Sequence, residues 1–585
     1  MRGMFSTLAT VWRISAPYFS SEDRWPGRIL LAAVIAIELS IVGITVLLNE
    51  WNARFYNALQ DHNWNAFLYQ LGYFCVLAAA FILLAVYQLY LNQWLQIRWR
   101  RWMTRVYLQD WLAGSTHYRM QLQGDAADNP DQRISEDIAQ FIQLTLTIGL
   151  QILNSSVTLL SFSFILWALS TAAPLPLFGM KLTIPGYLLW AALIYAVFGT
   201  LLTHLIGRPL VALNFQQQRY EADFRFNLVR VRENSEQIAL LEGNEAERER
   251  LLGRFGNVVA NWYALMTRQK KLTFFTAGYS QAAVVFPFVM VSPAYFANLV
   301  QLGGLMQTAN AFGQVQGALS VFVTLYRSLA EWRAVVERLS GFEQSVASAR
   351  RLATTPPRIT VAQGEAKQVA FKDLAVRLPT GVPLVNADNV TIGLGEHVLL
   401  SGPSGAGKST LFRALAGLWP FGEGSVTLPK DARLMILPQR PYFPIAPLAA
   451  AVAYPAEPGE FDVAAVAEAI AAVGLPGLAE RADEEAHWNR MLSLGEQQRL
   501  GIARALLHAP DYLFLDEATA SLDEAAEAAV YRLLLKRLPR AAIVSIGHRS
   551  TLATFHRRRL ALVPQGDHHV LNDAALSPAA STAAE

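Results

Sequence analysis

The chain has 585 residues, more than one soluble domain usually holds, so its length predicts two or three domains. Hydrophobic residues make up 53% of it and charged residues only 16%, and its mean hydropathy is positive, a composition typical of a protein partly embedded in a membrane. The net charge of +3 is too small to indicate a nucleic-acid partner, and a single cysteine excludes a disulfide framework.

Six apolar stretches predict membrane helices, since about 20 mostly apolar residues cross a bilayer. Residues 1–27 lack the apolar core and cleavage site of a secretory signal, and we expect an interfacial elbow helix there. Ser292-Pro293 and Gly303-Gly304 predict the break between the last two spans. Within a membrane domain of residues 28–345, the predicted spans are about 29–48, 68–92, 144–170, 187–207, 273–294 and 303–326.

The charges predict how these spans are oriented. Lys and Arg gather in the connections between spans two and three and between spans four and five, and are sparse in the other loops. By the positive-inside rule, both long connections and both termini face the cytoplasm. We expect a multi-pass protein of the bacterial inner membrane. Glu38 is the one acid within a span, and we expect it either to line a water-filled cavity or to hydrogen-bond between helices.

Beyond a linker at 346–360 the composition becomes that of a soluble α/β domain, residues 361–570, followed by a tail at 571–585 that we expect to be disordered. The apolar strand 397–400 runs into a glycine-rich loop and a helix, the context in which backbone N–H groups cradle phosphates. Lys408 would reach the β- and γ-phosphates of ATP, and the Ser409 hydroxyl would bind Mg²⁺. The loop residues predicted to bind ATP are Gly402, Pro403, Ser404, Gly405, Ala406, Gly407, Lys408, Ser409 and Thr410.

A second apolar strand, Tyr512 to Leu515, ends in Asp516-Glu517. A carboxylate at the first position suits Mg²⁺, and a glutamate next to it can polarise the attacking water. We therefore predict Asp516 as a metal ligand and Glu517 as the catalytic residue.

The segment from Leu492 to Arg499, LSLGEQQR, resembles the signature of ABC ATPases, and the similarity covers about residues 360–570. It implies that Ser493 and Gly495 contact the γ-phosphate of ATP held by a second chain, most simply a second copy, although a closely similar chain would serve equally well. Two positions depart from the commonest pattern: Leu494 replaces a glycine and Glu496 a glutamine. A third, Leu378, occupies the place of the aromatic residue that stacks on adenine; Phe371 or Tyr442 could supply the ring instead.

The same resemblance assigns three further roles. It implies that Gln439 belongs to the Q-loop, where it senses Mg²⁺ and the γ-phosphate. It implies that Asp523, in Ser521-Leu-Asp523, belongs to the D-loop at the ATP site. It implies that His548 is the switch histidine of catalysis.

The membrane half resembles the SbmA/BacA-like family, which is related to the D subfamily of ABC transporters. The similar segments are 49–64, 98–112, 128–141, 220–240 and 293–307. The resemblance implies a six-span membrane domain of type IV exporter-like fold, followed by the α/β P-loop ATPase, in a homodimer. It also implies short coupling helices near 112–133 and 221–243.

Together these features predict an ATP-driven transporter. The family resemblance implies import of hydrophilic or peptide-like solutes such as cobalamin or antimicrobial peptides. Export of lipid, acyl-CoA or peptide is the alternative within transport, and a membrane-anchored regulatory ATPase is the alternative outside it.

Overall fold

The computed structural model describes residues 2–123, 129–172, 175–177, 180–182, 185–457, 459–547 and 549–574. Its contacts divide the chain into two compact units. Unit 1 comprises residues 1–108 and 129–341, and unit 2 comprises residues 109–128 and 342–585. The second unit is thus built from two separate stretches of sequence.

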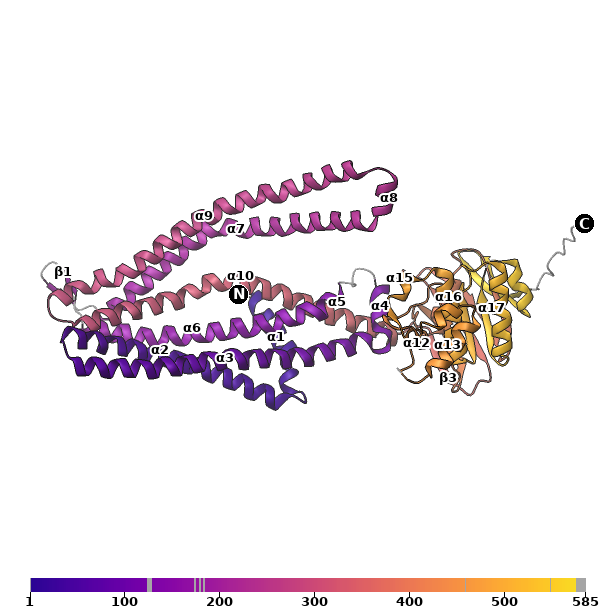
Figure 1. Ribbon diagram of the computed structural model, residues 1–585, viewed down its shortest axis with the longest axis horizontal. Coiled ribbons are helices and arrows are strands. Elements are labelled where there is room, and N and C mark those ends of the chain that lie inside the picture. Colours follow the sequence, from indigo (N-terminus) through magenta and orange to yellow (C-terminus); the bar gives the residue numbers. More distant parts are fainter. Residues whose placement is uncertain are drawn as a thin grey trace, which may run out of the picture. The chain divides into compact units, whose positions relative to one another are not determined.

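Unit 1 is built from long helices (Figure 1). The long helices are α1 (Arg2–Ser15), α2 (Arg24–Gln60), α3 (Trp64–Leu112), α6 (Ile138–Ala172), α7 (Tyr187–Glu233), α9 (Asn244–Phe296) and α10 (Leu302–Thr354), of which α3 and α10 continue into unit 2. A short helix η1 (Tyr18–Ser20) follows α1, and α5 (Pro130–Gln132) and the π-helical turn η3 (Arg133–Asp137) lead into α6. The strands β1 (Leu175–Leu177) and β2 (Met180–Leu182) pair antiparallel.

Among the described residues, five helices are long and apolar enough to cross a membrane, and they contain the first five predicted spans. The predicted class, a helical membrane domain followed by an α/β ATPase domain, is confirmed. The sixth predicted span lies in α10, which is one continuous helix but is not among those five. Its apolar run is interrupted by amide side chains such as Gln307, Gln314 and Gln316.

The break between the last two predicted spans is at residues 297–301, between the two predicted breakers. Helix α9 continues through Pro293 to Phe296, which a membrane helix tolerates, and Gly303 and Gly304 lie in the first turn of α10. Gly303 instead serves a close approach, because a Cβ there would lie 1.9 Å from the carbonyl oxygen of Ala53 in α2.

Glu38 joins three helices of unit 1. Its side chain is buried, and its carboxylate accepts one hydrogen bond from Gln88 of α3 and one from Asn154 of α6, the latter at 2.6 Å. Of the two roles that the sequence left open, this structure shows hydrogen bonding between helices.

Helices α7 and α9 lie side by side and are joined at one end by the short helix α8 (Ser235–Leu240) (Figure 1). The α8 segment falls within the second predicted coupling region. Leu240 and the following Leu241 are 77% and 82% exposed.

Unit 2 contains an eleven-stranded sheet in the order β3-β8-β4-β5-β15-β14-β7-β13-β12-β9, with β6 beside β4. The run β14-β7-β13-β12-β9 is parallel, and its central strands are apolar and buried, as expected for strands covered on both faces. The strands are β3 (Thr360–Gly364), β4 (Val369–Arg377), β5 (Pro383–Ala387), β6 (Thr391–Ile392), β7 (His397–Ser401), β8 (Gly422–Pro429), β9 (Leu434–Leu437), β12 (Tyr512–Asp516), β13 (Ala542–Ile546), β14 (Arg558–Gln565) and β15 (His568–Ala574).

The helices of unit 2 pack on this sheet and on each other. Strand β15 extends to Ala574, so the ordered domain runs a few residues past its predicted end, and residues 575–585 of the predicted tail lie outside the described residues. The main helices are α11 (Lys408–Leu415), α12 (Leu448–Ala453), α13 (Val463–Ala472), α16 (Leu494–His508) and α17 (Glu524–Arg537), with shorter turns α14 (Pro476–Ala479), α15 (Trp488–Met491) and η4 (Ser550–Phe555).

A segment from before α6 also belongs to unit 2. It contains η2 (Ala113–Ser115) and α4 (Thr116–Leu122), within the first predicted coupling region. Leu122 packs against an apolar core cluster of the sheet domain. Gln123 Nε2 donates to Ser348 Oγ at 3.1 Å, and Arg350 Nη2 donates to Asp110 Oδ1 at 2.6 Å.

Candidate nucleotide-binding site

The glycine-rich loop, residues 402–410, follows β7 and leads into α11, as the sequence predicts. Gly407 caps the helix with φ 91°, in the left-handed region that favours glycine. A Cβ at this position would also lie 2.7 Å from Val385 Cγ2 and 2.9 Å from Leu384 Cγ. Glycine is therefore required here on two grounds, and the turn leaves the N-terminus of α11 open to an anion.

Lys408 lies folded inside this loop. Its ammonium donates to the carbonyl oxygens of Gly402 at 2.9 Å and of Pro403 at 2.8 Å, and the residue is only 6% exposed. Burial lowers the pKa of the Lys408 ammonium, an effect that Glu517 and Asp516 oppose. The charge is thus held among backbone carbonyls, from which a triphosphate can attract it.

Ser409 and Asp516 meet at the carboxyl ends of β7 and β12. Ser409 Oγ donates to Asp516 Oδ1 at 2.8 Å. Burial raises the pKa of the Asp516 carboxyl above its usual range, while the hydrogen bond from Ser409 acts in the opposite direction. The hydroxyl and the carboxylate are hard oxygen donors, the kind that Mg²⁺ prefers, and the Gln439 side chain lies within hydrogen-bond distance of the adjacent Glu517.

Glu517 has an unusual backbone. Its φ of 52° places a non-glycine residue in the left-handed region, and its N–H donates to Ile546 O at 3.2 Å. Gln439 Nε2 donates to Glu517 Oε2 at 3.1 Å. Such strain is typical of residues held in place for function.

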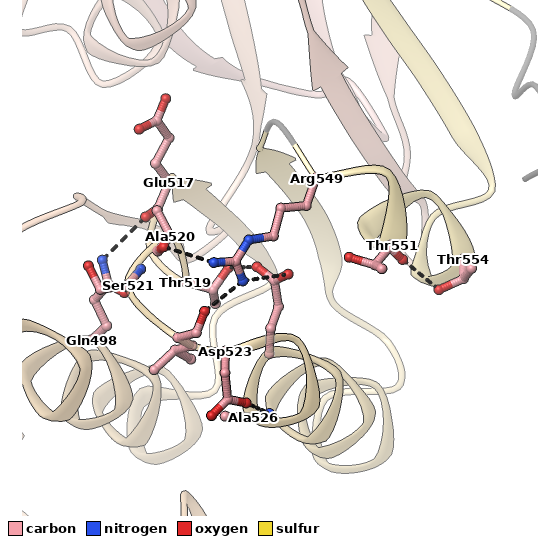
Figure 2. A network of polar contacts seen from close by, with 12 residues as sticks. Gln498, Glu517, Thr519, Ala520, Ser521, Asp523, Ala526, Arg549, Thr551 and Thr554 are labelled. Atoms are coloured by element: carbon pink, nitrogen blue, oxygen red, sulfur yellow. Dashed lines mark hydrogen bonds and ion pairs between the residues drawn. The ribbon is translucent and has the colours of Figure 1, made fainter.

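Gln498, which the sequence analysis did not single out, organises the surroundings of Glu517. It is 1% exposed, and its amide nitrogen donates to the carbonyl oxygens of Gln439 at 2.9 Å and of Glu517 at 3.4 Å. Its amide oxygen accepts from Ser521 N at 2.9 Å (Figure 2). One side chain of α16 thus links the backbones of Gln439, Glu517 and Ser521. Its place inside the segment LSLGEQQR was the sequence feature that could have identified it.

Arg549 forms a second junction that the sequence did not reveal (Figure 2). Its guanidinium donates to Leu522 O at 2.6 Å and to Ala520 O at 3.3 Å, and it lies 3.5 Å from the buried carboxylate of Glu527. Glu527 in turn accepts from Thr519 Oγ1 at 2.6 Å. The neighbouring His548, predicted as the switch histidine, lies outside the described residues.

Asp523 has a local role in this chain. It is the N-cap of α17, and its Oδ1 accepts from Ala526 N at 2.7 Å (Figure 2). Its predicted contact with nucleotide therefore remains a prediction.

The predicted signature residues form the N-terminus of α16. Ser493 is its N-cap, and Gly495 lies in its first turn, where a Cβ would lie 3.3 Å from Ser521 O. Ser493 Oγ donates to Glu496 Oε2 at 2.7 Å. The signature and the D-loop of one chain are therefore neighbours.

The position expected to hold adenine is only partly open. Leu378 begins a tight turn, with its N–H bonded to Val382 O at 2.8 Å, and its side chain packs partly against an apolar core cluster. Phe371, one of the rings considered for stacking, is 4% exposed within that core, so the structure excludes it. Tyr442 is 61% exposed.

The arrangement gathers what phosphoryl transfer to water requires. Lys408 and the N-terminus of α11 can supply positive charge for phosphates, and Ser409 with Asp516 can supply oxygen ligands for a divalent cation. The Glu517 carboxylate, hydrogen-bonded to Gln439, can accept a proton from water.

Two protein-family models match the chain. The model of "ABC transporter transmembrane region 2" matches residues 14–296, and the model "ABC transporter" matches residues 385–520. The first covers most of unit 1 and the second the loop and strands just described.

Curated relatives match nearly the whole chain. An uncharacterized ABC transporter ATP-binding protein of Haemophilus influenzae is 36% identical over 96% of this chain and 93% of its own. The inner membrane ABC transporter ATP-binding protein YddA of Escherichia coli is 33% identical, covering 91% and 93%. The human lysosomal cobalamin transporter ABCD4 is 24% identical, covering 81% of each. Among solved structures, an ATP-bound bacterial Atm1-family ABC exporter superposes with a TM-score of 0.70 at 17% identity, covering 92% and 93%, which shows the fold.

Proposed function

This chain belongs to the ABC transporter family and is related to its D subfamily, so that it couples ATP hydrolysis to transport across a membrane, and from that premise we propose that two copies of it form an inner-membrane importer of hydrophilic or peptide-like solutes. We further assign it to the SbmA/BacA-like branch, with both termini in the cytoplasm. The resemblance of the membrane segments and the arginine-rich long connections support these two assignments.

The chemistry of the ATPase half follows from the site. Mg²⁺ would be held by Ser409, Asp516 and Gln439, and when bound it neutralises charge that develops on the phosphates. Lys408 binds and orients the phosphates, and Glu517 accepts the proton of the attacking water. Gln498 keeps the Gln439 and Ser521 backbones fixed beside Glu517.

Two observations support a second copy. The chain carries one phosphate-binding loop and one signature, and in ABC ATPases the signature of one domain closes over ATP held by the loop of another, which two-fold symmetry satisfies. The tip of the α7–α9 pair also exposes Leu240 and Leu241 next to charged residues, an apolar patch suited to docking on a partner surface.

The observation that carries the transport proposal is the contact of α4 with the sheet domain. Leu122 packs on the core cluster beside the phosphate-binding loop, so a segment between two membrane helices is attached to the ATPase fold. Closure of the ATPase domains can then shift the membrane helices, which is the coupling that transport requires. A membrane-anchored regulatory ATPase that transports no solute would not need this contact.

The solute and the direction of transport rest on similarity. The relative ABCD4 is named a lysosomal cobalamin transporter, and the membrane segments resemble a family with importers of hydrophilic solutes. The test is uptake of labelled cobalamin and of proline-rich peptides by cells that lack or overproduce the protein, with Glu517→Gln as the inactive control. Uptake that follows wild-type protein alone supports import. Equal uptake in all strains, with ATP-dependent release of lipid or acyl-CoA from loaded vesicles, contradicts it.

A further inference from the structure

Glu496 and Ser493 are tied together by three hydrogen bonds at the start of α16. Glu496 Oε2 accepts from the Ser493 hydroxyl at 2.7 Å and from the Ser493 N–H at 2.9 Å. The N–H of Glu496 donates to Ser493 Oγ at 3.3 Å. The two residues form a reciprocal capping box, and the hydroxyl proton of Ser493 is directed at the carboxylate.

The capping box does not require a charge. Glutamine at the third helical position completes it as well as glutamate does, because either side chain offers an oxygen to the N-cap N–H. Glutamine is also the commonest residue at this place in the signature. The glutamate of this chain therefore adds one feature, a negative charge in the first turn of α16.

That charge opposes the binding of a phosphate at the same helix end. The N-terminus of a helix attracts anions through its free N–H groups, and a carboxylate in the first turn cancels part of that field. The hydrogen bonds from Ser493 hold the pKa of the Glu496 carboxyl below its usual range, so the charge is present at neutral pH. A hydrogen bond to a charged acceptor is also stronger than one between neutral groups, so releasing the hydroxyl is costly.

We propose that Glu496 is a brake on the closure of the ATP-bound dimer: its carboxylate retains the Ser493 hydroxyl and repels the γ-phosphate of ATP held by the partner copy. The proposal rests on the dimeric function proposed above, which brings Ser493 to that phosphate. Ser493 is exposed and Glu496 half-buried, so the hydroxyl is free to turn once the carboxylate swings away. Glu496 is thus a positioning residue that sets how much ATP is needed for closure.

The test compares Glu496→Gln with wild type in the full-length protein in lipid. Glu496→Gln keeps the cap and removes the charge, so we expect the KM for ATP to fall at least threefold, with a smaller decrease in Tm than loss of the cap causes. Because exposed charges are screened by salt, the ratio of the wild-type KM to the variant KM should decrease toward one as the ionic strength is raised. Glu496→Ala removes cap and charge together and should lower the Tm as well. Glu480→Gln, an exposed acid of the same unit, is the matched control and should change neither value.

A second measurement separates closure from turnover. In the background of Glu517→Gln, where hydrolysis is blocked, the ATP concentration that half-saturates nucleotide retention should fall with Glu496→Gln. An unchanged or raised value, or a KM ratio that does not respond to salt, overturns the brake. If Ser493→Arg leaves ATPase activity intact, the composite site itself is wrong; if Ser493→Arg abolishes activity while Glu496→Gln changes nothing, only the brake is wrong.

Discussion

The side-chain amide of Gln439 donates a hydrogen bond to the carboxylate of Glu517 at 3.1 Å, although the two residues are 78 positions apart in the chain. The predicted Q-loop residue and the residue predicted to accept the proton of water are therefore in contact within a single chain. Because Gln439 is also one of the ligands proposed for Mg²⁺, this hydrogen bond joins a proposed metal ligand to Glu517.

Glu517→Gln should leave ATP binding intact and reduce hydrolysis to less than a tenth of the wild-type rate. The amide keeps the shape of the side chain and loses the ability to take a proton from water. The dimer should then stall with two ATP molecules bound. Phosphate release and nucleotide retention measure the two effects, with Glu365→Gln, an exposed acid of the same unit, as control. Turnover above a tenth of wild type contradicts the catalytic role.

Lys408→Ala should lose ATP binding itself. The substitution removes the buried ammonium that bonds the Gly402 and Pro403 carbonyls, and so removes positive charge from the phosphate cradle. Equilibrium binding of a labelled nucleotide checks this, and Lys430→Ala, an exposed lysine that follows β8, should bind normally. Normal nucleotide affinity in Lys408→Ala would show that the loop has been misinterpreted.

Ser493→Arg should abolish ATP turnover while ATP still binds to the variant's own phosphate loop. Arginine is much larger than serine at a position proposed to contact the partner's ATP, and it cannot replace the hydroxyl that caps α16. In a homodimer both composite sites are affected. ATPase rate and nucleotide affinity, measured on the same sample, separate the two effects, and full ATPase activity would refute the composite site.

Leu378→Tyr should tighten ATP binding by up to about tenfold, if roughly 1.4 kcal/mol of base stacking is restored. Leucine offers only apolar contact, and part of its surface is already in contact with the domain core. Wild type should therefore discriminate weakly between ATP and GTP. Nucleotide affinities of wild type, Leu378→Tyr and Leu378→Ala give the answer. A strong wild-type preference for ATP with no gain from tyrosine would assign the base to another ring, such as the exposed Tyr442.

His556 should make stability depend on pH below neutrality. Its ring is buried between Leu552 O at 2.7 Å and Ser545 Oγ at 2.9 Å, and burial lowers its pKa from 6.5 to about 4. The folded state thus favours the neutral ring, and its contribution is full above pH 6.5 and is lost as the pH falls through about 4. The loss is on the order of 3 kcal/mol.

The variant His556→Gln isolates this effect. Its Tm should be lower than that of wild type at pH 8 and should change less between pH 6.5 and 4.5, because no ring is left to protonate. Thermal unfolding of the full-length protein at several pH values measures both. Equal pH dependence in the two proteins would assign the effect to other groups.

The phosphate-binding elements could be predicted from sequence because their chemistry requires a local backbone. The loop 402–410 and the strand before Asp516 use residues adjacent in the chain, and the structure has the strand, loop and helix in the predicted order. The tertiary junctions could not be predicted in this way. Gln498 and Arg549 act by reaching carbonyl oxygens more than 18 residues away, and no local pattern records such contacts.

The membrane half shows a similar limit. Composition identified the apolar helices, whereas the close approach of Gly303 in α10 to Ala53 of α2 has no local pattern that would predict it. Two roles of Glu38 were compatible with its sequence, and the choice between them required the positions of Gln88 and Asn154 on other helices. Helix packing, rather than helix formation, is what the sequence left undetermined.

The ATPase unit has a boundary that no single cut in the sequence can follow. Residues 109–123 belong with it, although more than 200 residues of membrane domain separate them from Phe342, where the unit resumes. A soluble fragment that starts at Phe342 would lose Leu122 from its apolar cluster and the partners of Ser348 and Arg350. Such a fragment would expose the apolar surface that Leu122 covers and would be less stable than the same unit in the full chain. The stability and ATPase activity measured on it would therefore be lower than those of the full-length protein. The ATPase unit is continuous in space but not in sequence. A soluble version of it would have to include the α4 segment, joined to the residues from Phe342 onward.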